Sequence, residues 1–211
     1  TTRMRHVTVR YINLRGQSPL IHHFNSSGQL SLMATVIRES SMKQYLESSE
    51  FVNWSHADIQ DIARLLKADF KTDTEIAKAC FEYVRDTIKH SWDFQIDIIT
   101  CKASDVLEHK TGYCYSQSHL LAALLRANGI PAGLCYQRLS VNGSGAPYCL
   151  HGLNAVYLKE LGWYRIDPRG NKQGVEARFS PPVEQLAFRT EGRLETDIQG
   201  IWAEPLPVIV K

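Results

Sequence analysis

A thiol, an imidazole and a carboxylate follow one another along the chain at Cys114, His151 and Asp167. A thiolate can attack a carbonyl carbon, and an imidazole can carry the proton between the sulfur and a leaving group. A carboxylate can hold that imidazole in the right tautomer and orientation. These three residue types therefore predict nucleophilic acyl transfer, provided that the fold brings them together.

The cysteine is expected at the start of a helix. Residues 120–127 form a continuous apolar segment, and Gly129 and Pro131 are typical of the residues that follow a helix end. The helix should therefore begin within a few residues of Cys114. Unpaired backbone N–H groups at that end carry partial positive charge, which stabilises a thiolate and lowers its pKa below the free value of about 8.5.

Two predicted strands carry the other two residues. Strand-like patterns occur over residues 132–141, 149–158 and 162–167. His151 lies near the start of the second strand and Asp167 at the end of the third. Neighbouring strands of a hairpin can bring an imidazole and a carboxylate onto one face of a sheet.

The loop between these strands does not by itself bring His151 and Asp167 together. The segment KELG, residues 159–162, predicts a short hairpin loop. Closing the hairpin evenly pairs Leu158 with Trp163. Continuing that pairing puts Asp167 opposite Asn154 rather than the histidine, so a bulge, a longer loop or an early separation of the strands would be needed.

Two amphipathic helices are expected before the cysteine. The first is predicted to begin at Ser55, which Asp58 follows three residues later. The second has Thr72 and Glu75 in the arrangement of a capping box. Cys80 falls on the apolar stripe of this second helix, which predicts a small core residue.

The order of elements indicates the fold class and the domains. Alternating residues predict a hairpin within about residues 1–40, and a short helix is expected near residues 105–108. Helices followed by an antiparallel sheet define an α+β arrangement. We expect a strand-rich segment, residues 1–42, to pack on a main domain of residues 43–211. The tail GIWAEPLPVIVK is expected to pack across that domain.

The stretch GYCYSQSHLLAALLRANGIPAGLCYQRL, followed by YCLHGLNAVYLKELGWYRIDPRGN, resembles the core of the transglutaminase-like superfamily, which includes bacterial cysteine proteases. That family has a cysteine that opens a helix ending in RA-GIPA, a histidine that opens a strand, and GW before DP. Cys114, His151 and Asp167 match this pattern in order and context. The resemblance covers residues 70–170 approximately, and it implies a papain-like fold with a Cys-His-Asp triad.

The resemblance also implies a reaction. Cys114 would form a thioester with an amide substrate, and water would then hydrolyse it, or an amine would replace it by transamidation. The backbone N–H of Cys114 is expected to supply half of an oxyanion hole. The indole N–H of Trp92 is a candidate for the other half, and the alternative for Trp92 is a packed aromatic side chain.

Two positions depart from the family pattern. The usual aromatic residue two positions after the histidine is Leu153, and the usual acidic residue four positions after it is Ala155. These residues shape the strand surface near the site. The family's substrate preference is therefore not transferred to this chain, whereas the three triad positions match.

Other readings of the same residues stay open. His119 lies five residues after Cys114, about 140° around a helix, and is expected to be a surface or packing residue. Asn154 could orient His151, but on a strand the two side chains point to opposite faces. A zinc site could use Cys149 and the histidine, but it lacks a CxxC or HxxxH pair.

Three more cysteines, Cys101, Cys135 and Cys149, are expected to be structural thiols, although Cys149 could lie near the cleft because it shares a strand face with the base. A binding module that keeps the fold without turnover is the rival from another class. It has no need of an acidified thiol, so the reactivity of Cys114 separates the two readings.

Composition narrows the possible partners and setting. The 211 residues contain 24 Lys and Arg against 22 Asp and Glu, and the loose basic set at positions 3, 5, 10 and 15 has no aromatic platform. Nucleic acid is therefore not an expected partner. No apolar run approaches the roughly 18 residues of a membrane span. Five sparse cysteines favour a reduced, cytoplasmic setting.

We expect a peptide or small amide as substrate, and neither a metal nor an organic cofactor.

Overall fold

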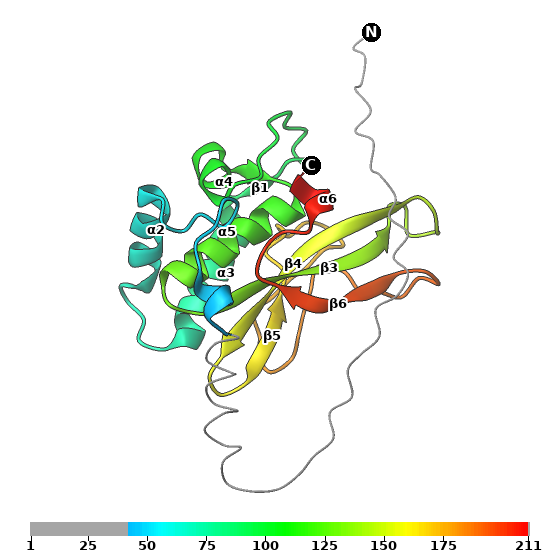
Figure 1. The fold of residues 1–211 in the computed structure, drawn as a ribbon. Coiled ribbons are helices and arrows are strands. Elements are labelled where there is room, and N and C mark those ends of the chain that lie inside the picture. The colour runs from blue at the N-terminus through cyan, green and yellow to red at the C-terminus, as the bar shows by residue number, and fades with distance from the viewer. Residues whose placement is uncertain (1–41, 211) are drawn as a thin grey trace, which may run out of the picture.

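The computed structural model describes residues 42–210, which form a group of helices packed against an antiparallel sheet (Figure 1). The first half of the chain contains η1 (Gln44–Leu46), α2 (Ala57–Lys67), α3 (Asp73–Thr87), β1 (Lys89–His90), α4 (Ala103–His109), β2 (Thr111–Gly112) and α5 (Cys114–Ala127). The second half contains β3 (Ala132–Ser140), β4 (Tyr148–Leu158), β5 (Gly162–Ile166), β6 (Thr196–Trp202) and α6 (Pro207–Val210). The predicted α+β class is confirmed.

Some sequence predictions lie outside the described residues. The hairpin expected within residues 1–40, the basic set in it and the domain boundary at residue 42 stay predictions for that reason. Within residues 42–210, no helix is both long enough and apolar enough to cross a membrane.

Four strands form the main sheet in the order β5-β4-β3-β6, and each neighbouring pair is antiparallel. The two short strands β1 and β2 form a separate parallel pair, in which His90 lies opposite Gly112. Because β2 ends two residues before α5 begins, this pair brings residue 90 close to the start of that helix.

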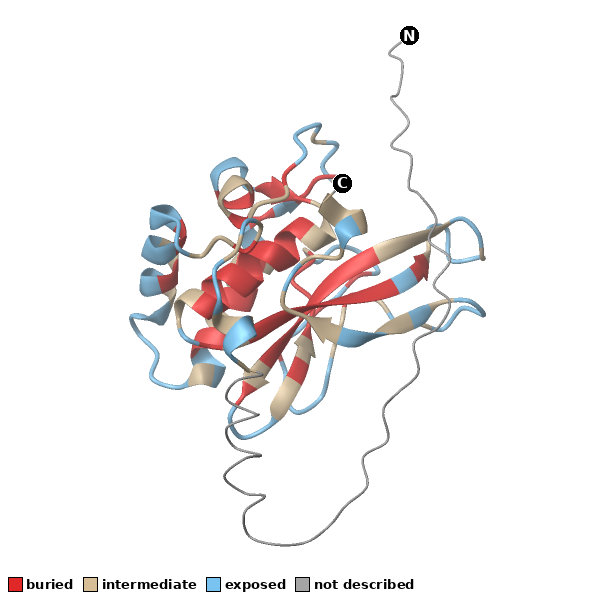
Figure 2. Cartoon of the chain, viewed as in Figure 1, coloured by how far each residue is buried: buried red, intermediate tan, exposed pale blue. Residues whose placement is uncertain are grey.

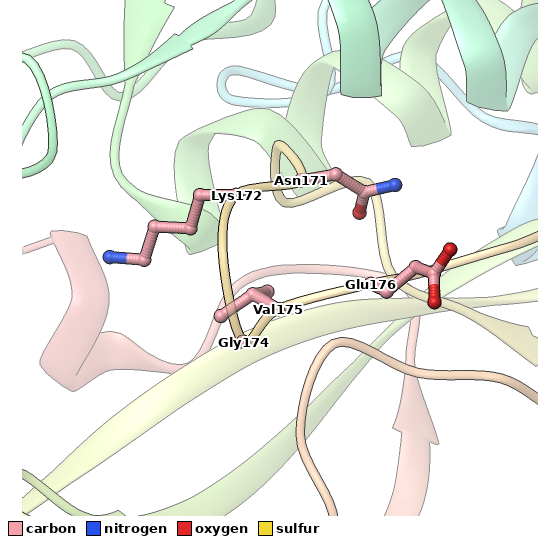
Figure 3. A pocket seen from close by; sticks show the side chains of 5 residues that line it. All are labelled: Asn171, Lys172, Gly174, Val175 and Glu176. Atoms are coloured by element: carbon pink, nitrogen blue, oxygen red, sulfur yellow. The ribbon is translucent and has the colours of Figure 1, made fainter.

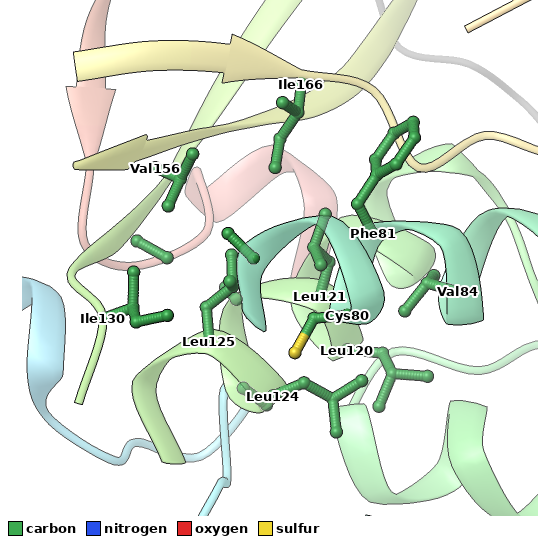
Figure 4. Close-up of a cluster of buried hydrophobic side chains, with 14 of the residues drawn as sticks. Cys80, Phe81, Val84, Leu120, Leu121, Leu124, Leu125, Ile130, Val156 and Ile166 are labelled. Carbon is green, nitrogen blue, oxygen red and sulfur yellow. The ribbon is translucent and has the colours of Figure 1, made fainter. Parts of the chain in front are cut away.

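Helix α5 lies between the other helices and the sheet, and every residue from Ser116 to Arg126 is buried (Figure 2). Its leucines belong to one apolar cluster with side chains of α3 and of the sheet (Figure 4). Cys80 of α3 is a fully buried member of this cluster, as predicted. Burial of this kind contributes roughly 25 cal/mol per Å² of apolar surface, so α5 is held mainly by its packing.

The two earlier helices begin differently. The capping box at Thr72 and Glu75 is present, and it caps α3 as predicted. Helix α2, in contrast, begins at Ala57 after His56 and has no side-chain cap, so the predicted start at Ser55 is wrong by two residues. The Ser55 hydroxyl instead lies 3.1 Å from that of Ser48.

The hairpin between β4 and β5 has a register one residue away from the even closure. Leu158 pairs with Gly162 rather than Trp163, because the loop holds three residues and Gly162 adopts a positive φ of +80°. The last pair is Asn154 with Ile166. A shift of one residue turns a strand's side chains to the other face, so the observed register puts Asp167 on the side of the sheet that carries the histidine.

The C-terminal tail packs on the domain as expected. Strand β6 pairs with β3 at the edge of the sheet, and the Leu206 N–H donates to the Tyr136 hydroxyl at 3.2 Å. The buried guanidinium of Arg126, at the end of α5, donates to the Ala203 carbonyl at 2.6 Å and to the Glu47 carbonyl at 2.8 Å. One arginine therefore ties the central helix to both ends of the described chain.

Candidate active site

Cys114 is the first residue of α5, after the extended residue Tyr113. The N–H groups of the first helical turn have no acceptor within the helix, so they present partial positive charge beside the sulfur. The N–H of Gly152, on β4, donates to Cys114 Sγ at 3.4 Å. Cys114 is half-buried, and it lies where the central helix meets the sheet.

The polar first turns of α5 are buried because they bind the chain segment that precedes them. Their side chains contact backbone carbonyls of residues 88–101: Gln117 Nε2 to Ile88 at 2.9 Å, Ser116 Oγ to Thr100 at 2.6 Å, and His119 Nδ1 to Cys101 at 2.7 Å. His119 is thus a packing residue and not a surface one, and burial lowers its pKa to about 4. These bonds fix the end of the helix that carries the thiol.

Gly152 lets this helix approach the sheet closely. A Cβ atom at position 152 would lie 2.7 Å from the Cα of Tyr115, which is too close for any side chain. Sequence reasoning missed this residue, although a glycine directly after a candidate catalytic histidine is a signal of close backbone approach.

Asp167 lies just beyond the end of β5 and is fully buried. Its Oδ2 accepts from His151 Nε2 at 2.8 Å and from the Ala187 N–H at 3.1 Å. Its Oδ1 accepts from the Arg169 N–H at 3.2 Å. Three donors therefore hold this carboxylate, which satisfies the condition for burying a charge.

The bond to Asp167 fixes the tautomer of His151. An ionised carboxylate only accepts hydrogen bonds, so Nε2 carries the hydrogen and Nδ1 is left for the sulfur of Cys114. The structure thus brings together all three residues of the triad predicted from the sequence. Asn154 does not take part, because its amide donates to the Ser118 carbonyl at 2.9 Å on the other face of the sheet.

Thiol and imidazole shift each other's pKa in opposite directions. Burial opposes ionisation of Cys114, but the charge and hydrogen bond of His151 outweigh it. Hydrogen bonds from His90 and the Gly152 N–H add to this effect, so the pKa of Cys114 is lowered to about 5. Burial also disfavours the charged form of His151, but the charges of Asp167 and Cys114 raise its pKa to about 10. Both shifts favour the thiolate and imidazolium form of the pair.

The imidazole of His151 lies on the face of the sheet that is turned away from α5, here called the outer face. A segment without helix or strand covers it there. The ring of Phe188 packs edge-on against His151, with ring centres 5.0 Å apart. The Arg169 guanidinium lies over the ring of Phe188, 5.4 Å from the ring centre. Sequence reasoning missed both residues, because the chain around Phe188 forms no helix or strand and so shows no periodic pattern.

His90 is a second imidazole at the thiol, and sequence reasoning missed it as well. It is 7 % exposed, and a hydrogen bond from it is among the causes that lower the pKa of Cys114. The sequence gives little sign of this position, because strands of two residues are too short to show an alternating pattern.

The predicted role of Trp92 stays a prediction. Its side chain is 67 % exposed, and within residues 42–210 no hydrogen bond or ring contact joins it to the triad. The five cysteines are all free thiols. Cys149 does lie near the site, since burial and the negative charge of Cys114 raise its pKa. Among the described residues, no three side chains gather in an arrangement that could hold a metal ion.

The two departures from the family pattern have a local explanation. Leu153 and Ala155 are fully buried on the outer face of the sheet, in a small cluster with Cys135. Trp163, Leu186 and Ile201 pack against that cluster. An acidic residue at position 155 would be buried there among apolar side chains, so an alanine suits this surface.

A cavity of about 590 Å³ lies at the loop that follows Asp167 (Figure 3). Asn171, Lys172, Gly174, Val175 and Glu176 line it. None of these residues belongs to the triad. Lys172 nevertheless connects the loop to the site, since its Nζ contacts Asp93 Oδ1 at 2.6 Å.

A helix that opens with a cysteine, packed on an antiparallel sheet that supplies a histidine and an aspartate, defines an α+β protein of the papain-like type. Residues 60–168 match the Transglutaminase-like superfamily. The match covers more than half of the chain, and the chain therefore belongs to this superfamily, as the resemblance implied. The fold of this family is typical of cysteine hydrolases and transferases.

Two solved structures with similar arrangements come from the bacteria Cytophaga hutchinsonii and Pseudomonas aeruginosa. One is "a Putative Cysteine Protease from Cytophaga hutchinsonii", 18% identical, with a TM-score of 0.49 and coverage of 61% of this chain and 42% of that chain. Another is the periplasmic domain of TgpA from Pseudomonas aeruginosa, 19% identical, with a TM-score of 0.44 and coverage of 62% and 47%. This chain thus matches less than half the length of either. No curated protein sequence matched the chain.

Proposed function

We propose that this protein is a thiol-dependent enzyme that acts on amide bonds through a covalent thioester at Cys114. The observation that supports this most is the 2.8 Å hydrogen bond between His151 Nε2 and the buried Asp167 carboxylate. That bond leaves the other ring nitrogen for the sulfur, which is the arrangement that a thiol nucleophile requires. A peptide or a small amide is the proposed substrate.

In the first half of the reaction, the Cys114 thiolate attacks the amide carbonyl carbon and the charge moves onto the carbonyl oxygen. The carbon–nitrogen bond then breaks, and the amine leaves with the proton that His151 held. Asp167 stabilises the imidazolium before this transfer. The backbone N–H of Cys114 is unpaired within α5 and is the proposed donor to the oxyanion, with Trp92 as the proposed second donor.

In the second half, a nucleophile attacks the thioester and gives its proton to His151. Water releases a carboxylic acid, whereas an amine forms a new amide, and either reaction regenerates the ion pair. We favour hydrolysis because water is always present. The alternative is an amine-transferring transglutaminase, and the further alternative is a non-catalytic binding module.

The pH dependence of Cys114 alkylation distinguishes an enzyme from a non-catalytic binding module. We would measure iodoacetamide labelling of Cys114 against pH by peptide mapping, in the wild type and in His151→Ala. Labelling should persist to about pH 6 in the wild type, because the pKa of Cys114 is lowered to about 5. In the variant the midpoint should rise to the ordinary value of about 8.5 or above, because burial remains and the cation is gone.

Cys101 serves as an internal control in the same peptide map. Burial raises its pKa to about 11, so it should be labelled only in strongly alkaline solution. If Cys114 behaves like an ordinary thiol in both proteins, the binding module becomes the better reading.

A chromogenic ester tests acyl transfer directly. p-Nitrophenyl acetate should give a burst of about one p-nitrophenolate per thiol, followed by slow turnover, and Cys114→Ser should abolish the burst. Adding hydroxylamine distinguishes the two outcomes for the thioester. Hydroxamate formation that outpaces hydrolysis at millimolar amine would favour transfer, and acetate alone would favour hydrolysis.

A further inference from the structure

His90 is placed beside the thiol by backbone pairing and not by a flexible loop. As the second residue of β1, it lies opposite Gly112, two residues before Cys114. Its ring packs edge-on against Tyr113, with centres 5.8 Å apart. Because the side chain is only 9 % exposed, the imidazole has little freedom to turn away from the start of α5.

The other nitrogen of this ring is left without a hydrogen bond. Nδ1 of His90 is buried and has no partner within residues 42–210, and its nearest carboxylate oxygen, on Asp93, is 3.8 Å away. A buried polar atom without a partner is costly, so a different contact must set the orientation of the ring. The sulfur of Cys114, whose pKa is lowered in part by a hydrogen bond from His90, is the candidate partner for Nε2.

Asp93 is itself held firmly behind His90. Its carboxylate accepts from the Arg169 guanidinium at 2.7 Å and from Lys172 Nζ at 2.6 Å. The backbone N–H of the same Arg169 donates to Asp167 Oδ1 at 3.2 Å. The residues that follow β5 therefore reach both sides of the thiol, to His151 through Asp167 and toward His90 through Asp93.

We propose that His90 is a second imidazole of the active site, which donates its Nε2 hydrogen to the Cys114 sulfur and holds the thiolate together with His151. This rests on the proposed function, since it concerns the same nucleophile. Nε2 carries a hydrogen both in one neutral tautomer and in the cation, so the donation does not require a charged ring. His151 moves the proton during the reaction, whereas His90 keeps the sulfur anionic while it waits for substrate.

Several titratable or charged groups face the thiol and this imidazole from the elements packed around them. They are His151 and Cys149 from β4, Tyr113 and Tyr115 from the start of α5, and Asp93 with its partners Arg169 and Lys172. A test must therefore change the donor at position 90 and leave these groups in place.

The test compares two substitutions of His90 by the pH midpoint of Cys114 alkylation. His90→Phe keeps a ring against Tyr113 but removes the donor, and should raise the midpoint by about one pH unit, a roughly tenfold slower alkylation at pH 4. His90→Gln keeps an N–H donor near the position of Nε2, and should stay within about 0.3 unit of the wild type. His109→Gln, on the exposed end of α4, is the matched control and should change nothing.

Each outcome decides the proposal. An unchanged midpoint in His90→Phe would overturn it, and equal shifts in the Phe and Gln variants would overturn it too, because they would indicate a packing role. An acidic wild-type thiol with an unchanged Phe variant would reject the inference and leave the proposed function standing. An ordinary wild-type thiol would reject both. Circular dichroism of each variant establishes that it is folded before labelling.

Discussion

The two faces of the main sheet are covered in different ways. The inner face packs against α5, and Tyr136, Val156 and Ile166 join the leucines of that helix in the main core. The outer face carries the imidazole and carboxylate of the candidate triad, and the irregular segment around Phe188 covers it. Regular structure thus supports the fold on one side, while chain without repeating structure completes the chemistry on the other.

This difference separates what holds the protein together from what tunes its reactivity. If it is correct, substitutions on the inner face should lower stability and leave the thiol acidic. Substitutions on the outer face should slow acyl transfer more than they lower stability.

The largest effect is expected from Asp167→Asn. This change puts an amide NH2 group within reach of His151 Nε2, where it can donate a hydrogen bond and force the wrong imidazole tautomer, so acylation by p-nitrophenyl acetate should slow by about a thousandfold or more. Stopped-flow measurement of the burst gives the rate. Asp58→Asn is the control, since that side chain is 74% exposed, and it should leave the rate unchanged. A rate within threefold of the wild type in Asp167→Asn would show that the carboxylate does not orient the base.

Leu121→Ala tests the inner face. The side chain is fully buried in α5, so its loss should reduce the free energy of unfolding by about 3 kcal/mol in urea titrations. The alkylation midpoint of Cys114 should not move. Leu65→Ala, at a position 70% exposed, should cost well under about 1 kcal/mol. A shifted midpoint in Leu121→Ala would mean that core packing also sets the thiol pKa.

Phe188→Ala tests the outer cover. Without the ring that packs edge-on against His151, the imidazole is held less firmly, and acylation should slow by about tenfold. Unfolding free energy should fall by only about 1 kcal/mol, because Phe188 is partly buried. Phe70→Ala, at a position 40% exposed, provides the comparison. The opposite pattern, a large loss of stability with normal acylation, would mean that the packing of Phe188 against the main core matters more than its contact with His151.

The smallest effect is expected from Cys149→Ser. This thiol shares a strand face with His151, and burial raises its pKa, so it is neutral while the active thiol is ionised. A neutral hydroxyl in its place should move the Cys114 midpoint by less than about 0.3 unit. A larger shift in the alkylation midpoint would mean that Cys149 influences the ionisation of Cys114.

The sequence predicts the inner face better than the outer one, for physical reasons. Apolar periodicity identifies α5, a capping box identifies the start of α3, and the family resemblance identifies the three triad residues in order. Helical and strand periodicity arise from repeated side-chain positions, so they are readable wherever an element packs on a core.

What could not be predicted depends on single residues without a pattern. The positive φ of Gly162 changes the hairpin register by one residue, and that one residue decides which face Asp167 joins. Phe188 covers the base from a segment with no repeat. His90 reaches the thiol through a strand of two residues, which is too short to alternate.

Because His151 and Gly152 are consecutive, one stretch of β4 delivers both the base and a backbone N–H that donates to the sulfur. The amide proton of Gly152 is therefore a built-in spectroscopic reporter. Its nuclear magnetic resonance signal should move as the thiol gains a proton or an acyl group, without any label near the site. Acylation, inhibition and titration could each be followed at that one peptide bond in the native protein.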